Sequence, residues 1–234
     1  MSGTLINFGT ILIGGMVGLL LGSRLAERVK KTVVSGLGLF TMVYGISLFI
    51  ETSNSLIVLG SVLIGILLGE WWKIEEGLEH LAAWLESRFN KSGQSDGKEK
   101  FIKGFLTATL VFCIGPMAIL GSIDNGLTGN INTLVVKSIL DGFAAMAFAS
   151  SLGVGVLFSA FMVLIYQGSI SLLASQVQSF ATPVMMTELT ATGGVLLVAI
   201  AVSSLLELRK IRTASLLPAL IVAPLIVWII SLIK

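Results

Sequence analysis

Residues 4–22 read TLINFGTILIGGMVGLLLG and contain no charged side chain. A helix needs about 20 mostly apolar residues to cross the hydrocarbon layer of a membrane. This stretch is too long for the apolar core of a signal peptide, and its basic residues follow it instead of preceding it. It is therefore predicted to be a membrane-spanning helix, and it indicates the fold class of the chain.

The composition extends this prediction to all 234 residues, of which 55% are hydrophobic and 12% charged. The mean hydropathy is +0.97. A soluble domain usually carries a charged fraction of about 25%, so lipid must solvate much of this surface. We expect an all-α, polytopic helical membrane protein that forms a single transmembrane domain over residues 1–234.

Eight segments have the required length and apolar character: 4–23, 32–50, 54–71, 102–121, 132–150, 153–175, 184–206 and 214–233. The fifth and sixth are separated by the short sequence SSLG at residues 150–153, which predicts a tight helical hairpin. If segment 102–121 re-enters the membrane without crossing it, the number of spans falls to seven.

The basic residues predict the orientation of these spans. Thirteen of the fifteen Lys and Arg residues follow the first, third or seventh segment, and only Lys137 and Lys234 do not. Cytoplasmic loops of membrane proteins are enriched in Lys and Arg. With eight spans, both the N-terminus and the C-terminus are therefore predicted to lie outside the cytoplasm.

Residues 72–100 form the longest predicted connector, on the cytoplasmic side. Its first part has apolar residues at spacings of three and four, which predicts an amphipathic helix; these residues are Ile74, Leu78, Leu81, Leu85 and Phe89. Trp71, Trp72 and Trp84 are typical of a membrane interface. Residues 90–100, NKSGQSDGKEK, are predicted to be a flexible polar linker.

Residues 112–130, FCIGPMAILGSIDNGLTGN, interrupt an apolar segment with Gly115 and Pro116. Proline has no backbone N–H and clashes with the preceding helical turn, so a discontinuous helix is predicted here. Irregular backbone at membrane depth is tolerated where protein or a watery cavity satisfies its polar groups. In transporters, such breaks supply carbonyl groups to cations. A simple proline kink is the alternative.

Three acidic residues lie at or near membrane depth, where ionisable groups are costly and usually functional. Asp141 is well inside the fifth segment, and its structural alternative is an ion pair with Lys137 four residues earlier. Glu188 follows Pro183 by about one turn, where the helix dipole alone favours an acid. Asp124 follows the break, and its alternative is a turn residue in Asp-Asn-Gly.

The sixth segment carries Gln167 near its middle, and an amide in hydrocarbon needs a hydrogen-bond partner. That partner is either a neighbouring helix or a bound ion or substrate. Together with the three acids, the candidate ion or substrate pathway consists of Asp141, Glu188, Asp124, Asn125, Gln167, Gly115, Pro116, Thr187 and Thr190.

Few residues are suited to enzyme chemistry. Cys113 and His80 are the single cysteine and histidine, which excludes an intramolecular disulfide and metal clusters built on these residue types. Glycine-rich phosphate loops and nucleophile elbows are absent from the sequence. We therefore expect no enzymatic activity, no cofactor or metal and no nucleic-acid partner. The sequence leaves open whether the chain forms a homo-oligomer.

Two short sequences, GTILIG at residues 9–14 and GSVLIG at residues 60–65, resemble each other. Each precedes a Leu-Leu-Gly that ends a span. Many transporters are built from internal repeats, so this similarity raises the hypothesis of a duplication, with chance similarity between glycine-rich helices as the alternative.

Four sequences resemble the YqgA-like family of bacterial membrane proteins: FCIGPMAILGSIDNGLTGN at 112–130, KSILDGFAAMAFASSLGVGV at 137–156, YQGS at 166–169 and TELTATGG at 187–194. The resemblance covers essentially the whole chain. It implies a multi-pass protein of the bacterial cytoplasmic (inner) membrane, in a family catalogued as a domain of unknown function. Some members are loosely described as sodium channels or pumps, and no catalytic residues exist to carry over.

The leading hypothesis is a small cation-coupled transporter or ion pathway for Na⁺ or H⁺. Asp141 and Glu188 would be the coupling acids, and the partners would be lipid and a small cation or solute. The alternative is a scaffold or sensor, whose polar groups only hold helices together. An intramembrane enzyme is a third hypothesis, for which no nucleophile and base are visible.

Overall fold

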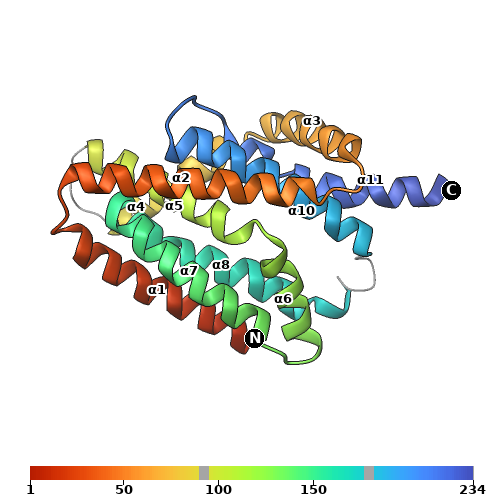
Figure 1. Cartoon of the computed structure of the whole chain (residues 1–234), viewed down its shortest axis with the longest axis horizontal. Coiled ribbons are helices and arrows are strands. Elements are labelled where there is room, and N and C mark those ends of the chain that lie inside the picture. The colour runs from red at the N-terminus through yellow and green to blue at the C-terminus, as the bar shows by residue number, and fades with distance from the viewer. Residues whose placement is uncertain (90–94, 177–181, 234) are drawn as a thin grey trace. The chain divides into compact units, whose positions relative to one another are not determined.

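The computed structural model of the protein describes residues 1–89, 95–176 and 182–233 (Figure 1). The regular secondary structure in these residues is helical, without a β-strand. Within the described residues, six helices are long and apolar enough to cross a membrane, and two bent helix pairs raise the number to as many as eight. The prediction of an all-α, polytopic membrane protein is therefore confirmed.

The helices pack as two compact units. Unit 1 comprises Met1–Gly36 and Glu79–Val177, and unit 2 comprises Leu37–Leu78 and Gln178–Lys234. The chain passes between the units within α2 (Glu27–Ile50) and α4 (Ile74–Phe89). Each unit has buried polar residues of its own.

In unit 1, α1 (Ser2–Gly22) lies along α7 (Asn132–Leu152) (Figure 1). Glycine at every fourth position of α1 allows this close approach. A Cβ atom at Gly18 would lie 2.2 Å from the carbonyl oxygen of Met146, a distance that no side chain tolerates. Gly14 and Gly22 meet the α7 backbone in the same way. Small residues at this spacing commonly let membrane helices pack closely.

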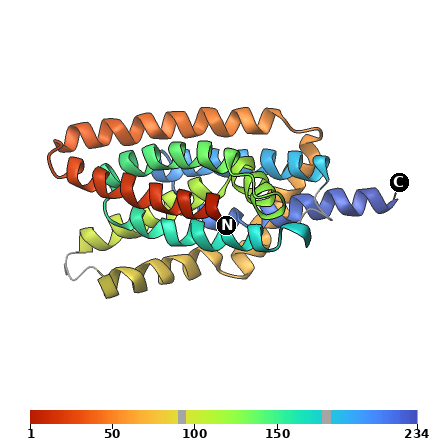
Figure 2. The same ribbon diagram turned by 90° about the horizontal axis from the view of Figure 1, so that it is seen from below.

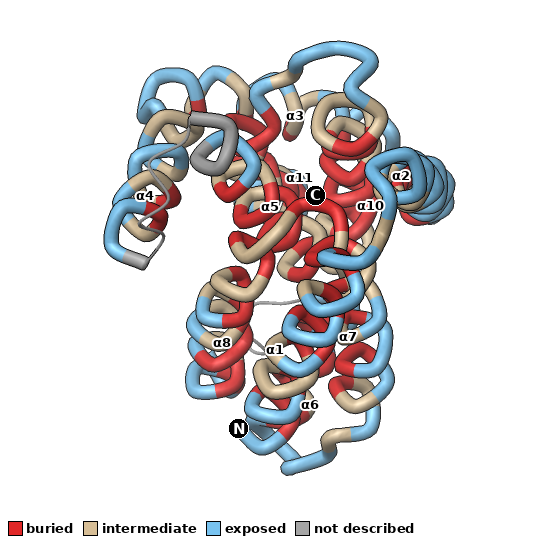
Figure 3. Tube along the Cα trace, turned by 90° about the vertical axis from the view of Figure 1, so that its left-hand side faces the viewer, coloured by how far each residue is buried: buried red, intermediate tan, exposed pale blue. Residues whose placement is uncertain are grey.

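The predicted helical hairpin is present in unit 1. Helix α7 ends at Leu152 and α8 spans Gly155–Leu172. Gly153 lies between them with φ 84°, a conformation that favours glycine because it has no Cβ. Figure 3 shows the buried residues of α1, α7 and α8 on the faces where these helices meet.

The predicted discontinuous helix is also confirmed. Helix α5 (Ser95–Cys113) and helix α6 (Pro116–Leu127) are bent by 60° relative to each other at the break. Figure 2 shows the change of direction. Gly115 has φ 146° and ψ 150°, which is accessible essentially to glycine alone. Pro116 takes the first helical position of α6, where its missing N–H costs nothing.

The interpretation of Asp124 as a turn residue is wrong, because α6 continues through Leu127. The Asp124 side chain instead accepts hydrogen bonds from Oγ1 of Thr128 and Nδ2 of Asn130, both at 2.8 Å. These bonds tie the end of α6 to the residues that follow. Glycine at 126 lets α6 pack closely, because a Cβ there would lie 2.2 Å from the carbonyl oxygen of Ser171.

The predicted amphipathic helix is α4 (Ile74–Phe89). In unit 1, its residue Ala82 is buried with Phe101 and Phe105 of α5, and Leu81 and Leu85 pack against the same cluster. Part of the apolar face of α4 therefore contacts protein. Trp84 is 60% exposed.

The predicted linker at 90–100 is wrong in its second half. Residues 90–94 lie outside the described residues, but α5 already begins at Ser95. Lys98, Glu99 and Lys100 are good helix formers. They extend α5 toward its N-terminus, and the buried Phe101 and Phe105 hold that helix in place.

Unit 2 contains residues 37–50 of α2, α3 (Ser55–Trp71), α10 (Pro183–Ile200) and α11 (Ala219–Ile233). The predicted seventh span ends in a π-helical segment, Ala201–Leu205, and the eighth begins as a 3-10 helix, Thr213–Leu216. Glycines again mark close contacts, since a Cβ at Gly69 would lie 1.9 Å from the carbonyl oxygen of Ser215. Helix α2 is exposed over much of its length (Figure 3).

The two similar sequences at 9–14 and 60–65 lie on α1 and α3. Their final glycines, Gly14 and Gly65, each face a neighbouring backbone closely enough to exclude a Cβ. Both glycines therefore allow a close backbone contact within their own units. The internal duplication itself stays a hypothesis.

Candidate functional site

One face of α7 carries two buried ionisable groups of unit 1, Lys137 and Asp141. Leu134, Lys137, Ser138 and Asp141 are all buried and recur at helical spacing on this face. Asp141 follows the first residue of α7 by nine positions, or about 13 Å along a helix axis. Its carboxylate thus lies well inside the helix.

Lys137 and Asp141 form the intrahelical ion pair that their spacing of four residues indicates. The ammonium of Lys137 donates to Oδ2 of Asp141. The side chains are 8% and 11% exposed, so the pair is largely withdrawn from the surroundings. Because opposite charges adjoin, this part of α7 is neutral overall while holding two ionisable groups.

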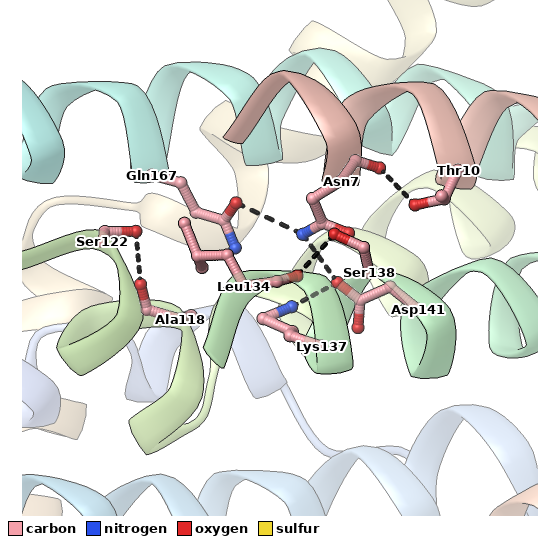
Figure 4. A network of polar contacts seen from close by, with 9 residues as sticks. All are labelled: Asn7, Thr10, Ala118, Ser122, Leu134, Lys137, Ser138, Asp141 and Gln167. Carbon is pink, nitrogen blue, oxygen red and sulfur yellow. Dashed lines mark hydrogen bonds and ion pairs between the residues drawn. The ribbon is translucent and has the colours of Figure 1, made fainter. Parts of the chain in front are cut away.

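A second helix reaches the pair through Asn7, which is fully buried on α1. Its Nδ2 donates a hydrogen bond of 3.0 Å to Oδ2 of Asp141 and another of 3.2 Å to Oε1 of Gln167 on α8. Figure 4 shows Asn7 between the two acceptors. Three helices far apart in the chain therefore meet in one polar network.

The neighbouring serines keep their hydrogen bonds mostly within their own helices. The hydroxyl of Ser138 donates to the carbonyl oxygen of Leu134, and that of Ser122 donates to Ala118 (Figure 4). Such bonds satisfy buried hydroxyl groups without linking helices. The interhelical contacts of this network thus depend on the amides of Asn7 and Gln167.

Helix α6 places two further candidates in unit 1. Asp124 is half-buried and bonded to Thr128 and Asn130, as described above. Asn125 is 3% exposed, and neither Oδ1 nor Nδ2 has a hydrogen-bond partner in the part of the chain that the structure describes. Gly115 and Pro116 form the junction at the start of the same helix.

Glu188 lies on α10 in unit 2 and is fully buried. Its carboxylate accepts from Oγ1 of Thr52 at 2.6 Å and from the backbone N–H groups of Ser53 and Asn54 at 2.9 and 3.0 Å. These donors form the turn between α2 and α3. Glu188 thereby supplies acceptors to backbone groups that precede a helix and have no partner within it.

The candidate residues divide between the two units. Asp141 and Gln167 are joined through Asn7, and α6 carries the candidates at 115, 116, 124 and 125 in the same unit. Glu188 belongs to unit 2 with the half-buried Thr187 and the buried Thr190.

Sequence reasoning missed Asn7 and Thr52. Asn7 had a usable signal, because it is the one amide in the apolar run of residues 4–22. The argument that selected Gln167, the cost of an unpaired amide in hydrocarbon, applies equally to it. Thr52 had no such signal, because it lies in a short polar connector.

In residues 1–89, 95–176 and 182–233, no group of three or more His, Cys, Asp or Glu side chains is placed to hold a metal ion. The polar network around Asp141 offers one carboxylate, one ammonium and the amides of Asn7 and Gln167.

The helices and their buried ion pair define the class of this molecule, a polytopic α-helical membrane protein with ionisable groups inside a helix bundle. The chain belongs to the family described as "Protein of unknown function (DUF554)", whose model matches residues 2–228. This match confirms the resemblance to the YqgA-like family.

Two relatives are similar over nearly their whole lengths. "Uncharacterized protein YqgA" of Escherichia coli (strain K12) is 33% identical over 221 residues, covering 94% of each chain. "Uncharacterized membrane protein YdfK" of Bacillus subtilis (strain 168) is 29% identical over 234 residues, covering 98% of this chain and 97% of the relative. No solved structure matches the chain significantly.

Proposed function

We propose that the protein is a small ion-translocating protein of the bacterial cytoplasmic membrane, a cation-coupled transporter or ion pathway. The observation that carries the proposal is the buried Lys137–Asp141 pair, held by Asn7 and, through it, by Gln167. The proposed activity is transport and involves no covalent catalysis.

Burying the Lys137–Asp141 ion pair costs free energy. Removing two charges from water is expensive, and apolar residues of similar volume often stabilise a protein as well or better. Ionisable residues inside membrane segments therefore usually mark an ion or proton path. The contact from Asn7 of α1 supports this reading, since an intrahelical pair needs no amide from another helix to neutralise its charge.

The geometry favours H⁺ over Na⁺ as the ion. Oδ2 of Asp141 already accepts from Nζ of Lys137 and Nδ2 of Asn7. A Na⁺ ion at this carboxylate would lie beside the ammonium and repel it. A proton instead can move from Nζ of Lys137 to Oδ2 of Asp141, which leaves a neutral amine and a carboxylic acid and needs no new ligand.

The contacts of Glu188 suit a different task. Three donors from the α2–α3 turn surround its carboxylate, which fits a residue that positions this turn. Asp141 is therefore the proposed ion-carrying acid, and Glu188 positions the turn between α2 and α3.

The test is ion flux in liposomes containing purified protein and a pH-sensitive dye. Under an imposed membrane potential or pH gradient, the wild type is expected to move H⁺. Asp141→Asn is expected to abolish the flux, measured on the protein that is shown to be folded. Asp124→Asn is the matched control, because it also neutralises an acid of unit 1 but one bonded to neighbouring surface residues.

Parallel runs with Na⁺ gradients distinguish the two ions. Flux that requires Na⁺ and persists without a pH change would contradict the preference for H⁺. Wild-type liposomes without ion flux under any gradient, or unchanged flux in Asp141→Asn, would favour the scaffold alternative.

A further inference from the structure

Unit 1 contains buried polar atoms that have no hydrogen-bond partner among the described residues. Two of them are the hydroxyl oxygens of Thr107 and Thr109 on α5. The others belong to four residues of α1, α6 and α8: Oγ1 of Thr4, Oδ1 of Asn7, Nε2 of Gln167 and both amide atoms of Asn125. The four residues are between 0% and 3% exposed. Each buried polar group of this kind costs free energy when it is left without a hydrogen-bond partner.

Rotating the side-chain amides of Asn125 or Asn7, which exchanges their oxygen and nitrogen atoms, does not supply the missing hydrogen bonds. Rotating the Asn125 amide exchanges two atoms that both lack partners. Rotating Asn7 would direct an oxygen instead of its Nδ2 donor at Oδ2 of Asp141 and break the bond observed there. Buried polar atoms left in this way are normally satisfied by bound water, which makes two to four hydrogen bonds.

Two of the helices that carry these atoms, α1 and α6, pack against Leu134 of α7, which is itself fully buried. A Cβ at Gly3 of α1 would lie 2.7 Å from Leu134, and one at Gly121 of α6 would lie 2.9 Å from it. Gly3 adjoins Thr4, and Gly121 lies one turn before Asn125. Thr4 and Asn125 thus lie on helices that pack against the same α7 residue.

A direct contact also joins α6 to α8. Oγ of Ser171 donates a hydrogen bond of 2.9 Å to the carbonyl oxygen of Ser122. Ser171 is one turn after Gln167, and Ser122 is one turn before Asn125. Asn125 and Gln167 therefore lie on helices that contact each other, each about one turn from that contact, and Gln167 in turn accepts a hydrogen bond from Asn7.

We propose that these atoms bind a chain of ordered water molecules leading from Asn125 to the Lys137–Asp141 pair. The unpaired set contains amide donors together with amide and hydroxyl acceptors, and adds no net charge to the neutral pair. A neutral molecule that both donates and accepts fits this set better than an ion. As the route by which protons reach Asp141, the water chain depends on the proposed function.

Hydroxyl-radical labelling by X-ray radiolysis tests for the water without requiring transport, because radicals formed from bound water oxidise adjacent side chains. In protein embedded in lipid nanodiscs, Leu134 is expected to be oxidised severalfold more than Leu196 of unit 2. Leu196 is the matched control, since the two leucines are 0% and 1% exposed. Equal, background labelling of both leucines would overturn the water chain.

Substitutions at Gln167 and Asn125 test whether these side chains bind the water. Gln167→Leu and Asn125→Leu are each expected to reduce Leu134 labelling severalfold. Ser159→Ala, which removes a fully buried α8 hydroxyl bonded to Val156 of its own helix, should leave the labelling unchanged. If both leucine variants fold and label like the wild type, the assigned atoms do not hold the water.

Flux separates this inference from the function on which it rests. Asn125→Leu is expected to lower H⁺ flux severalfold, with Ser159→Ala unchanged. Wild-type flux with Leu134 unlabelled would reject the water chain and keep the proposed function. Leu134 labelling without wild-type flux would keep the water site and reject its role in transport.

Discussion

Asn7 and Asp141 are 134 positions apart in the sequence, yet Nδ2 of Asn7 donates a hydrogen bond of 3.0 Å to Oδ2 of Asp141. The same Nδ2 also donates to Gln167. One side chain of α1 therefore links the ion pair of α7 to the amide of α8.

Replacing Asn7 with leucine should destabilise the protein by about 1–3 kcal/mol, because Asp141 and Gln167 both lose a buried donor. The measurement is the unfolding temperature of purified protein in detergent. Thr10→Val is the control, since the Thr10 hydroxyl bonds only the carbonyl oxygen of Asn7 within the same helix. Equal stability of the two variants would contradict the linking role of Asn7.

The Lys137–Asp141 pair should behave as a coupled unit in a double-mutant cycle. Lys137→Met or Asp141→Leu alone strands a buried charge and should cost about 3–5 kcal/mol. The double variant should recover most of this stability but conduct no ions. The exposed pair between Lys30 and Glu27 is the control and should show no measurable coupling. Recovery of flux together with stability would support a purely structural pair.

Glu188→Gln should loosen the turn between α2 and α3, because an amide has one acceptor oxygen where the carboxylate uses two. Hydrogen bonds to a charged group contribute about 1.5–3 kcal/mol each, so a comparable loss in unfolding free energy is expected. Glu51→Gln is the matched control, since Glu51 is exposed and precedes the same turn. Stability unchanged in Glu188→Gln would show that these bonds contribute little.

Gly18→Ala should separate α1 from α7, because the added methyl group would lie 2.2 Å from the carbonyl oxygen of Met146. Overpacking of this kind typically costs about 1–3 kcal/mol. Gly9→Ala adds the same group to the same helix where nothing lies within 4 Å and should be tolerated. Thermal unfolding in detergent compares the variants, and a stable Gly18→Ala protein would contradict the close contact.

The orientation is tested by cysteine labelling in intact cells, in a Cys113→Ala background. Glu51→Cys should react with a membrane-impermeant thiol reagent, and Lys210→Cys should react only after the cells are permeabilised. Both native residues are exposed in their connectors, so access depends on the side of the membrane. The opposite pattern would reverse the orientation predicted from the basic residues.

The features determined by the sequence alone are those with local causes. Apolar runs of membrane length predicted the helices, and the missing N–H of Pro116 beside Gly115 predicted the break between α5 and α6. The spacing of four residues brought Lys137 and Asp141 to one helix face. Two local predictions were wrong. Residues 95–100 were predicted to be a linker, but they belong to α5, which packs against α4. Asp124 was offered as a turn residue, but it lies within α6 and bonds Asn130 beyond the end of that helix.

Only the tertiary structure decided which side chains meet across helices. Asn7, Asp141 and Gln167 come together because glycines on α1 allow its backbone to approach α7 closely. The three donors on Glu188 and the unpaired atoms of Asn125 likewise depend on contacts between distant segments. Hydrophobic periodicity sets which face of a helix is buried, but the partner across that face follows from interhelical packing, which no local pattern records.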